Sequence, residues 1–302
     1  MDDGYVGGIA ALGTAMCWVG SALAFTSAGR RIGSMNVNLI RLLIGLFYLM
    51  VVQWIRRGLP LPTDASSHAW LWLSVSGLVG FTFGDLCLFR AFVVIGPRLA
   101  MLIMSLAPPI AALTAWIALG ERMSWADTAG MVLTLAGISW AILSRQPSHP
   151  EAQSPARTLR QTVWGVTLGF GGAVGQGVGL VLSKHGMGSY DALAATEIRL
   201  IAGAVGFALL FVGLRWWPKV AASVRNARGM RDTAIGAFFG PFLGVSLSLV
   251  AVQNESTGVA ASIMATTPIL IIPFSMRMYG EKVGFGGVAG AVLAVAGVAL
   301  FF

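Results

Sequence analysis

Long apolar stretches separated by short polar ones run through this chain from end to end. A helix needs about 20 mainly apolar residues to cross a bilayer, and we count ten stretches that reach this length. The pattern therefore predicts an all-α integral membrane protein with ten transmembrane helices. The expected spans cover residues 6–27, 36–55, 69–94, 98–118, 126–144, 163–183, 192–214, 233–253, 258–278 and 284–302.

Composition supports this fold class, since 56% of the residues are hydrophobic and 11% are charged, with a mean hydropathy of +0.79. A soluble domain carries about 25% charged residues. The net charge of +8 would suggest nucleic acid in a soluble protein. Here the bases lie in predicted loops, where membrane topology and anionic lipid headgroups account for them. We therefore expect membrane lipids around the chain and no nucleic-acid partner.

One segment of the chain occurs twice. Residues 84–140 align with residues 244–300 at a constant offset of 160 positions and without gaps. In this register Pro108 matches Pro268. Missing such a repeat would lead to the wrong fold, and in membrane chains repeats of this kind are typical of transport proteins.

Each half of the chain holds five predicted spans, and Arg41 with its neighbours matches Arg199 at an offset of 158. Because five is odd, the second half enters the membrane from the opposite face, which predicts an inverted repeat. The expected organisation is a first five-helix repeat (1–145), a linker loop (146–162) and a second five-helix repeat (163–302). Most loop Lys and Arg residues fall on one side, so the positive-inside rule places both termini outside.

Two prolines interrupt predicted spans at matching positions, Pro108 in the fourth span and Pro268 in the ninth. A proline inside a helix removes a backbone hydrogen bond and kinks the helix. Paired interruptions of this kind indicate a central substrate site, although a kink that merely fits the bundle is the alternative. Ser105 and Thr267 lie one turn or less before these prolines and offer hydroxyl groups. Met101 and Met264 on the same helices offer adaptable apolar surface.

Few ionisable residues lie inside the predicted spans, and such residues are functional candidates because they are costly in lipid. Asp85 lies deepest, and we expect it either to pair with Arg90 or Arg41 or to carry a proton. Arg41 and Arg199 lie only a turn or so inside their spans, so we expect their side chains to extend to the headgroups.

Neutral polar residues add further candidates for a lining. Gln176 and Gln253 would hydrogen-bond either to a neighbouring helix or to a substrate, and Trp18 with Ser21 forms a plausible lining pair on the first span. Small residues recur at every fourth position on three spans, which predicts close helix packing in the first place and is also compatible with helices that slide. These stripes are Ser76, Gly80 and Gly84; Gly171, Gly175 and Gly179; and Gly236, Gly240 and Gly244.

Catalytic and metal-binding signals are missing from the sequence. The three His residues fall in predicted loops, and Cys17 and Cys87 lie inside spans without forming a C-x-x-C pair. No recognised hydrolase or nucleotide-binding motif occurs. We expect no enzyme, no catalytic residue, no metal and no cofactor. A membrane channel or a lipid-modifying integral-membrane enzyme is the alternative.

The chain resembles the drug/metabolite transporter (DMT) superfamily, EamA family, over nearly its whole length. The resemblance rests on Pro108 followed by Gly120-Glu121-Arg122, repeated as Pro268 followed by Gly280-Glu281-Lys282, before an Ala/Gly-rich last helix in each half. It implies a secondary carrier for small organic metabolites, with a central cavity between the halves. In size and layout the chain is similar to the YddG-type aromatic amino acid exporters. The family's termini are usually drawn as cytoplasmic, which opposes the charge count, so orientation stays open.

Residues and resemblance together lead us to expect a multi-pass carrier of the bacterial inner membrane that exports a small, largely apolar metabolite, with amino acids first, by alternating access. Proton coupling through Asp85 and uncoupled facilitated diffusion both stay open. We expect a monomer, although the small-residue stripes would also serve dimer contacts. The expected substrate contacts are Trp18, Ser21, Asp85, Met101, Ser105, Pro108, Gln176, Gln253, Met264, Thr267 and Pro268.

Overall fold

The computed structural model describes residues 3–95, 97–144, 159–274 and 284–302, and regular structure in these ranges is helical throughout. Nine helices of the described chain are long and apolar enough to cross a membrane. The tenth expected span forms α16 (Phe285–Ala299), whose 15 residues fall short of the length of about 20 that a bilayer requires. The chain is therefore a multi-pass, all-helical membrane protein, and a tenth complete span stays a prediction.

The helices follow the order of the expected spans, several of which are divided into shorter pieces. The first half contains α1 (Asp3–Ile32), α2 (Ser34–Arg57), α3 (Ser67–Gly77), the π-helix η1 (Leu78–Gly84), α4 (Asp85–Ile95), α5 (Pro97–Met104), α6 (Ala107–Leu119) and α7 (Trp125–Ser144). The second half contains α8 (Leu159–Met187), α9 (Ala192–Gly213), α10 (Trp217–Val224), α11 (Ala227–Ala237), the π-helix η2 (Phe238–Gly244), α12 (Val245–Asn254), α13 (Thr257–Met264), α14 (Thr267–Leu270) and α16.

Glycine and side-chain caps define several helix ends. Gly33 separates α1 from α2 with a φ of 83°, a conformation that a residue with a Cβ rarely adopts. The carboxylate of Asp191 accepts a hydrogen bond from the backbone N–H of Ala194, 2.9 Å away, and so caps the first turn of α9. Ser256 caps α13 in the same way.

Two stretches that we expected to be loops contain helix. The segment 215–232 holds α10 and the start of α11, because Trp217 and Pro218 open a helical turn and Val220 is buried beneath it. The sixth span begins at Leu159, so the last residues of the expected linker 146–162 are helical. The rest of that linker lies outside the described residues.

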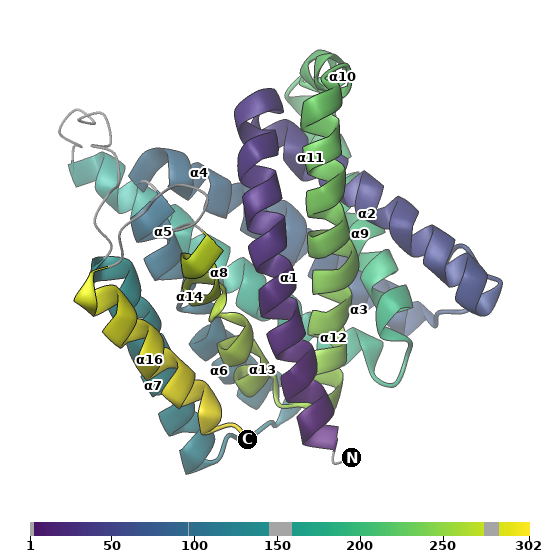
Figure 1. Ribbon diagram of the computed structural model, residues 1–302. Helices are drawn as coiled ribbons and strands as arrows, with labels where there is room; N and C mark the ends of the chain where they lie inside the picture. Colours follow the sequence, from purple (N-terminus) through teal and green to yellow (C-terminus); the bar gives the residue numbers. More distant parts are fainter. Residues whose placement is uncertain (1–2, 96, 145–158, 275–283) are drawn as a thin grey trace.

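The two halves pack into each other instead of lying apart. In Figure 1, α1 runs along α11 and α12 of the second half, and α8 packs in the corresponding way on α3, η1 and α4 of the first half. At one side of the molecule α7 lies beside α16, and at the opposite side α2 lies beside α9. Spans that hold matching places in the two halves are therefore paired with each other or packed in equivalent ways.

Small residues allow this close packing at the centre. A Cβ added to Gly175 of α8 would lie 2.6 Å from the Cα of Gly84, and one added to Gly240 of η2 would lie 2.7 Å from Ser21 Oγ of α1. Real Cβ atoms do not approach other atoms so closely, so α8 can touch the Gly84 backbone, and η2 the Ser21 side chain, only because positions 175 and 240 are glycine. The small-residue stripes on α8 and η2 thus lie at tight contacts between the halves.

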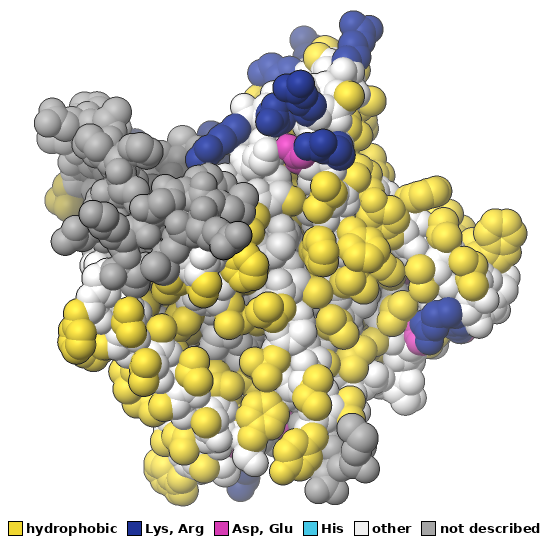
Figure 2. All heavy atoms as spheres, in the orientation of Figure 1, with side chains coloured by type: hydrophobic (Ala, Val, Ile, Leu, Met, Phe, Trp, Pro, Cys, Tyr) yellow, Lys and Arg dark blue, Asp and Glu magenta, His cyan; other side chains and the backbone are white. Residues whose placement is uncertain are grey.

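The two ends of the molecule differ in charge. Apolar side chains cover the middle of the face shown in Figure 2, whereas Lys and Arg gather at the end where α10 lies. The exposed bases of α1, α10, α11 and their connections are Arg30, Arg31, Arg215, Lys219, Arg225, Arg228 and Arg231. Both chain ends lie at the opposite end, where the rings of Tyr5 and Phe302 are 6.4 Å apart. An apolar middle with Lys and Arg gathered at one end is the pattern expected for a membrane protein.

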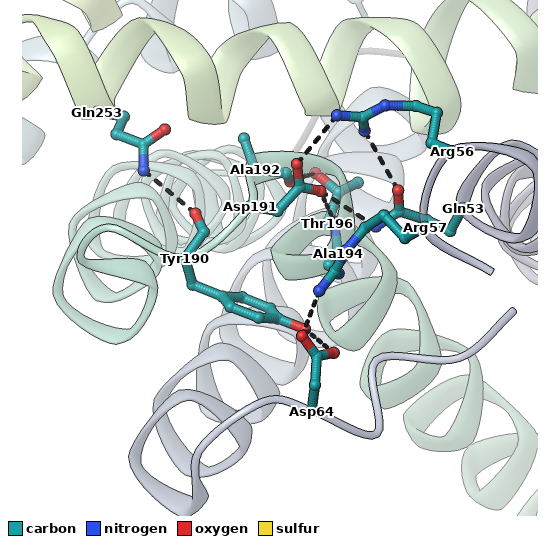
Figure 3. A network of polar contacts seen from close by, with 10 residues as sticks. All are labelled: Gln53, Arg56, Arg57, Asp64, Tyr190, Asp191, Ala192, Ala194, Thr196 and Gln253. Atoms are coloured by element: carbon teal, nitrogen blue, oxygen red, sulfur yellow. Dashed lines mark hydrogen bonds and ion pairs between the residues drawn. The ribbon is translucent and has the colours of Figure 1, made fainter. Parts of the chain in front are cut away.

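A polar network ties the halves together at the end near the termini (Figure 3). Asp191 before α9 accepts hydrogen bonds from Gln53 (3.1 Å) and Arg56 (3.3 Å) of α2. Asp64 pairs with Arg57 and accepts a 2.9 Å hydrogen bond from Tyr190. Although partial burial raises the pKa of the Asp64 carboxyl, the bonds from Tyr190 and Arg57 outweigh this effect and lower it overall.

Candidate functional site

The fourth and ninth spans are broken helices. α5 ends at Met104 and α6 begins at Ala107 with Pro108 in its first turn, and α13 ends at Met264 before α14 begins at Thr267. Both breaks therefore fall at the same place of the repeat, 160 positions apart. A proline has no N–H for the preceding turn, and in the second break Thr267 Oγ1 donates to the Met264 carbonyl (2.9 Å) that Pro268 leaves open.

The third and eighth spans share a second irregularity, which the sequence did not lead us to expect. Each contains a seven-residue π-helix, η1 at residues 78–84 and η2 at residues 238–244, again 160 positions apart. π-Helical turns are rare and are often found at functional sites. Pro241 inside η2 is a sequence signal that could have indicated this irregularity, although our predictions from the sequence did not draw on it.

These four irregular segments surround a central cavity of about 360 Å³. Its walls come from α1, α2, η1, α4, α5, α6, α7, α8 and α9 as well as η2 and α12–α14, so both halves contribute. The lining residues are Trp18, Ser21, Ala22, Arg41, Phe81, Asp85, Leu88, Met101, Met104, Ser105, Ala107, Pro108, Ala111, Ile138, Gln176, Gly177, Leu180, Arg199, Gly240, Pro241, Val245, Ser248, Ala261, Met264, Ala265, Thr267 and Pro268.

Most lining residues come in pairs that the repeat relates. The offset of 160 joins Phe81 with Pro241, Asp85 with Val245, Leu88 with Ser248, Met104 with Met264 and Pro108 with Pro268. The offset of 158 joins Trp18 with Gln176 and Arg41 with Arg199. The backbone frame of the cavity is therefore duplicated, whereas several of the side chains on it differ between the halves.

Of the described residues, three with charged side chains line this cavity. Asp85 at the start of α4 forms an ion pair with Arg41 of α2, and its other carboxylate oxygen accepts a 3.0 Å hydrogen bond from Gln176 of α8. Arg199 of α9 lies with its guanidinium carbon 5.0 Å from the centre of the Phe81 ring. Of the two expected partners of Asp85, Arg41 is the one that binds it, and Arg90 is exposed on the outer side of α4.

Our expectation that Arg41 and Arg199 extend to the headgroups was wrong. Arg199 is only 5% exposed, and both arginines line the cavity. Position along a span does not reveal which face of the helix a residue occupies, and these two face inward. Glu197, two residues before Arg199, is fully buried outside the cavity lining, and neither carboxylate oxygen has a hydrogen-bond partner among the described residues.

Ten of the eleven residues that we expected at the site line the cavity, and Gln253 does not. Its amide donates to the carbonyl groups of Gly188 (2.9 Å) and Tyr190 (3.1 Å), at the edge of the network in Figure 3. The hydroxyl of Ser105 donates to the Leu102 carbonyl at 2.6 Å, so it serves the broken helix as well as facing the cavity. Sequence reasoning missed Phe81 and Pro241.

The Gly-Glu-Arg triplet at residues 120–122 of the first half contacts the second half of the chain. Gly120 ends α6 with a φ of 68°, which turns the chain, and Glu121 forms a 2.7 Å ion pair with Lys184 of α8. Glu121 also accepts a 2.7 Å hydrogen bond from the backbone N–H of Thr257 at the start of α13. The matching triplet at residues 280–282 lies outside the described residues.

The chemistry of the lining is that of a binding cavity. Its walls are mainly apolar, with a small number of polar groups at fixed places, as is usual for small-molecule sites. Within the described ranges no group of three His, Cys, Asp or Glu side chains is placed to hold a metal ion.

Comparison with known proteins agrees with this architecture. A solved structure described only as the crystal structure of a protein matches with a TM-score of 0.73 and 18% sequence identity, over 97% of this chain and 95% of its own. At that identity the likeness shows the fold alone. No curated protein matches the sequence. The model of the EamA-like transporter family matches residues 6–143 and 163–302, nearly the whole chain. The chain therefore belongs to the EamA-like transporter family, whose members are membrane transporters of small molecules.

Proposed function

We propose that this protein is a secondary carrier that moves a small organic metabolite through the central cavity by alternating access. Amino acids are the first substrate class, with hydrophobic and aromatic ones favoured, and export from a bacterial cell across its inner membrane is the proposed direction. The single observation that carries the proposal is the cavity itself, which lies where the paired helix breaks and paired π-helices of the two halves meet.

The repeat supplies a mechanism. We propose that the halves are inverted relative to each other, so that ten spans form two five-helix units with opposite orientation. If the two halves exchange conformations, a cavity open at one end becomes open at the other without any change in the site itself. The packing of α1 on α11 and α12, and of α8 on α3 and α4, supports this symmetry.

Size and wall chemistry favour a small amphiphilic substrate. A volume of about 360 Å³ lies near the lower end of the range of roughly 300–1,000 Å³ for ligand pockets. Met101, Met104, Met264 and Trp18 form an adaptable apolar wall. Asp85 is the proposed group for proton coupling, and facilitated diffusion without coupling is the other possibility that the same experiment decides.

Counterflow in proteoliposomes tests the proposal. Vesicles are loaded in turn with unlabelled amino acids, nucleosides and sugars, and entry of the corresponding labelled compound is followed with and without a pH gradient. A carrier accumulates the label only when the lumen holds the same chemical class, and amino acids are expected to give the signal. Absence of counterflow with every compound would contradict the carrier, and a steady ionic current across the vesicle membrane would indicate a channel.

A further inference from the structure

Arg199 has no anionic partner in contact with it among the described residues. Its side chain is buried at the cavity wall, and no ion pair or hydrogen bond joins its guanidinium to another side chain in the described parts of the chain. The Phe81 ring supports one face of the group, and Gly80 lies beside it, since a Cβ there would be in van der Waals contact with Arg199 Nη2 at 3.5 Å. The guanidinium is thus held in position at the cavity but is not neutralised by contact.

The carboxylate of Asp85 does not fill this role. One of its oxygens is taken by Arg41 and the other by Gln176, and it acts on Arg199 only at longer range. In the described part of the chain, the charged residues of the cavity lining are two arginines and one carboxylate, which leaves one positive charge in excess. A buried charge without a partner is costly, so the missing anion is expected to arrive with a ligand.

We propose that Arg199 binds the carboxylate of the transported substrate, an inference that rests on the carrier function proposed above. Arginine presents a planar fork that matches a carboxylate with two parallel hydrogen bonds. The single excess charge suits a monoanion, since a phosphate dianion would leave the cavity negative. The apolar body of the substrate lies against Met101, Met104 and Trp18.

By the same charge balance, an amino group on the substrate is expected to contribute little to binding. Among the residues that the structure describes, Asp85 is the sole acidic residue of the lining, and both of its oxygens are already bound. An ammonium group entering the cavity therefore finds no unoccupied carboxylate. The substrate class is monocarboxylates with an apolar body, in which the carboxylate is required and the amino group is dispensable.

A matched series of ligands separates the two groups. The series consists of a hydrophobic amino acid, the same molecule without its amino group, its primary amide, and the amine left when the carboxylate is removed. In counterflow with the wild-type protein, the two carboxylates are expected to exchange at similar rates. The amide and the amine are expected to exchange at least about tenfold more slowly, as for the loss of a charge-assisted hydrogen bond worth about 1.5–3 kcal/mol.

Variants assign the effect to Arg199. Arg199→Gln is expected to abolish the preference for carboxylates, Arg199→Lys to keep part of it, and the exposed control Arg90→Gln to leave it unchanged. Stabilisation of the purified wild-type protein against heat by each ligand gives a second readout that does not need a folded variant. The desamino acid is expected to raise the melting temperature and the amide is not.

The outcomes distinguish this inference from the carrier itself. If the wild type exchanges the amide or amine as fast as the carboxylates, Arg199 does not bind the carboxylate but the protein is still a carrier. Exchange of carboxylates by a folded Arg199→Gln variant at the wild-type rate leads to the same conclusion. If the wild type exchanges no member of this series or of the wider panel, both the carrier and the inference fail.

Discussion

At the scale of single residues, the polar side of the cavity depends on the pairing of Asp85 with Arg41. Both side chains are largely withdrawn from water, so each charge is tolerated because the other is beside it. The repeat explains why this pair has no twin, since Val245 stands where a second aspartate would be and Arg199 is left without one. The asymmetry in charge is therefore a property of side chains on a duplicated frame.

Replacing one partner of this pair leaves the other as a buried charge without a counter-ion. We expect Asp85→Asn to lower the stability of the protein by about 3–5 kcal/mol, because it leaves a buried guanidinium without its carboxylate. The double variant Asp85→Asn with Arg41→Gln is expected to recover most of the loss, since neither charge remains. Thermal unfolding in detergent measures both, with the exposed Arg228→Gln as control. A double variant less stable than Asp85→Asn alone would refute the pairing.

Residue identity at the site was predictable where the signal lay in the chain itself. Pro108, Pro268 and their neighbours were found because a proline in an apolar span is visible in the sequence. The inward orientation of Arg41 and Arg199 was not, because hydropathy gives depth along a helix and not the face on which a side chain lies. Their match at an offset of 158 was the one signal that both belong to the site.

At the scale of elements, the broken helices are the feature that ties sequence to the cavity. Each of these two spans is interrupted at the cavity, between α5 and α6 in the first half and between α13 and α14 in the second. The cavity is therefore lined by helix ends and not by an unbroken helix. Discontinuous helices at matching places in two halves are where transporters bind substrates.

Restoring the backbone hydrogen bond at these breaks should stiffen the helices that the proposed alternating access requires to move. We expect Pro108→Ala and Pro268→Ala to reduce counterflow by about tenfold or more while expression changes little, as for a displacement of the site by a fraction of an ångström. Pro218→Ala in the exposed helix α10 is the matched control and should transport normally. Wild-type rates in both cavity variants would remove the role given to the breaks.

Close contact between α8 and η1 gives a prediction on stability. Gly175→Ala places a methyl group 2.9 Å from the Val79 carbonyl oxygen and 2.6 Å from Gly84 Cα, so we expect a loss of about 1–3 kcal/mol from overpacking. Gly213→Ala, with nothing within 4 Å, is expected to be neutral or slightly stabilising. Melting temperatures of the two variants decide the matter, and equal values would show that η1 yields to the added group.

The existence and order of the helices followed from hydropathy, but their irregularities did so only in part. An apolar run marks a helix by its length, so most spans were expected within a few residues of their ends. A π-helix differs from an α-helix only in which carbonyl accepts the hydrogen bond of each N–H. An apolar sequence gives no signal for this difference unless it contains a residue such as Pro241, which has no N–H.

At the scale of the whole molecule, the two ends on either side of the cavity differ in their charged residues. At the end near the termini, ion pairs join the two halves, such as Lys184 with Glu121 and Arg56 with Asp191. The other end carries the exposed bases around α10. The sequence predicted the duplication from its constant offset, whereas the interlocking of the halves could not be read from it because it depends on contacts between distant segments.

The basic end also predicts orientation. By the positive-inside rule it faces the cytoplasm, so a protease site fused to the N-terminus should be cleaved from outside intact cells. Cleavage only after the cells are opened would place the termini inside, as the family resemblance implies. Cleavage of a site inserted at Gly58 gives the control, since this loop lies at the same end as the termini.

Alternating access is the central claim, and paired spin-label distances test it most directly. In a variant with Cys17 and Cys87 replaced by Ser, labels at Arg30 and Arg160 report on the basic end, and labels at Tyr5 and Trp125 report on the other. All four positions are exposed. When a substrate found by counterflow is added, we expect one distance to lengthen while the other shortens. Distances that stay fixed, or that change in the same sense at both ends, would contradict the account.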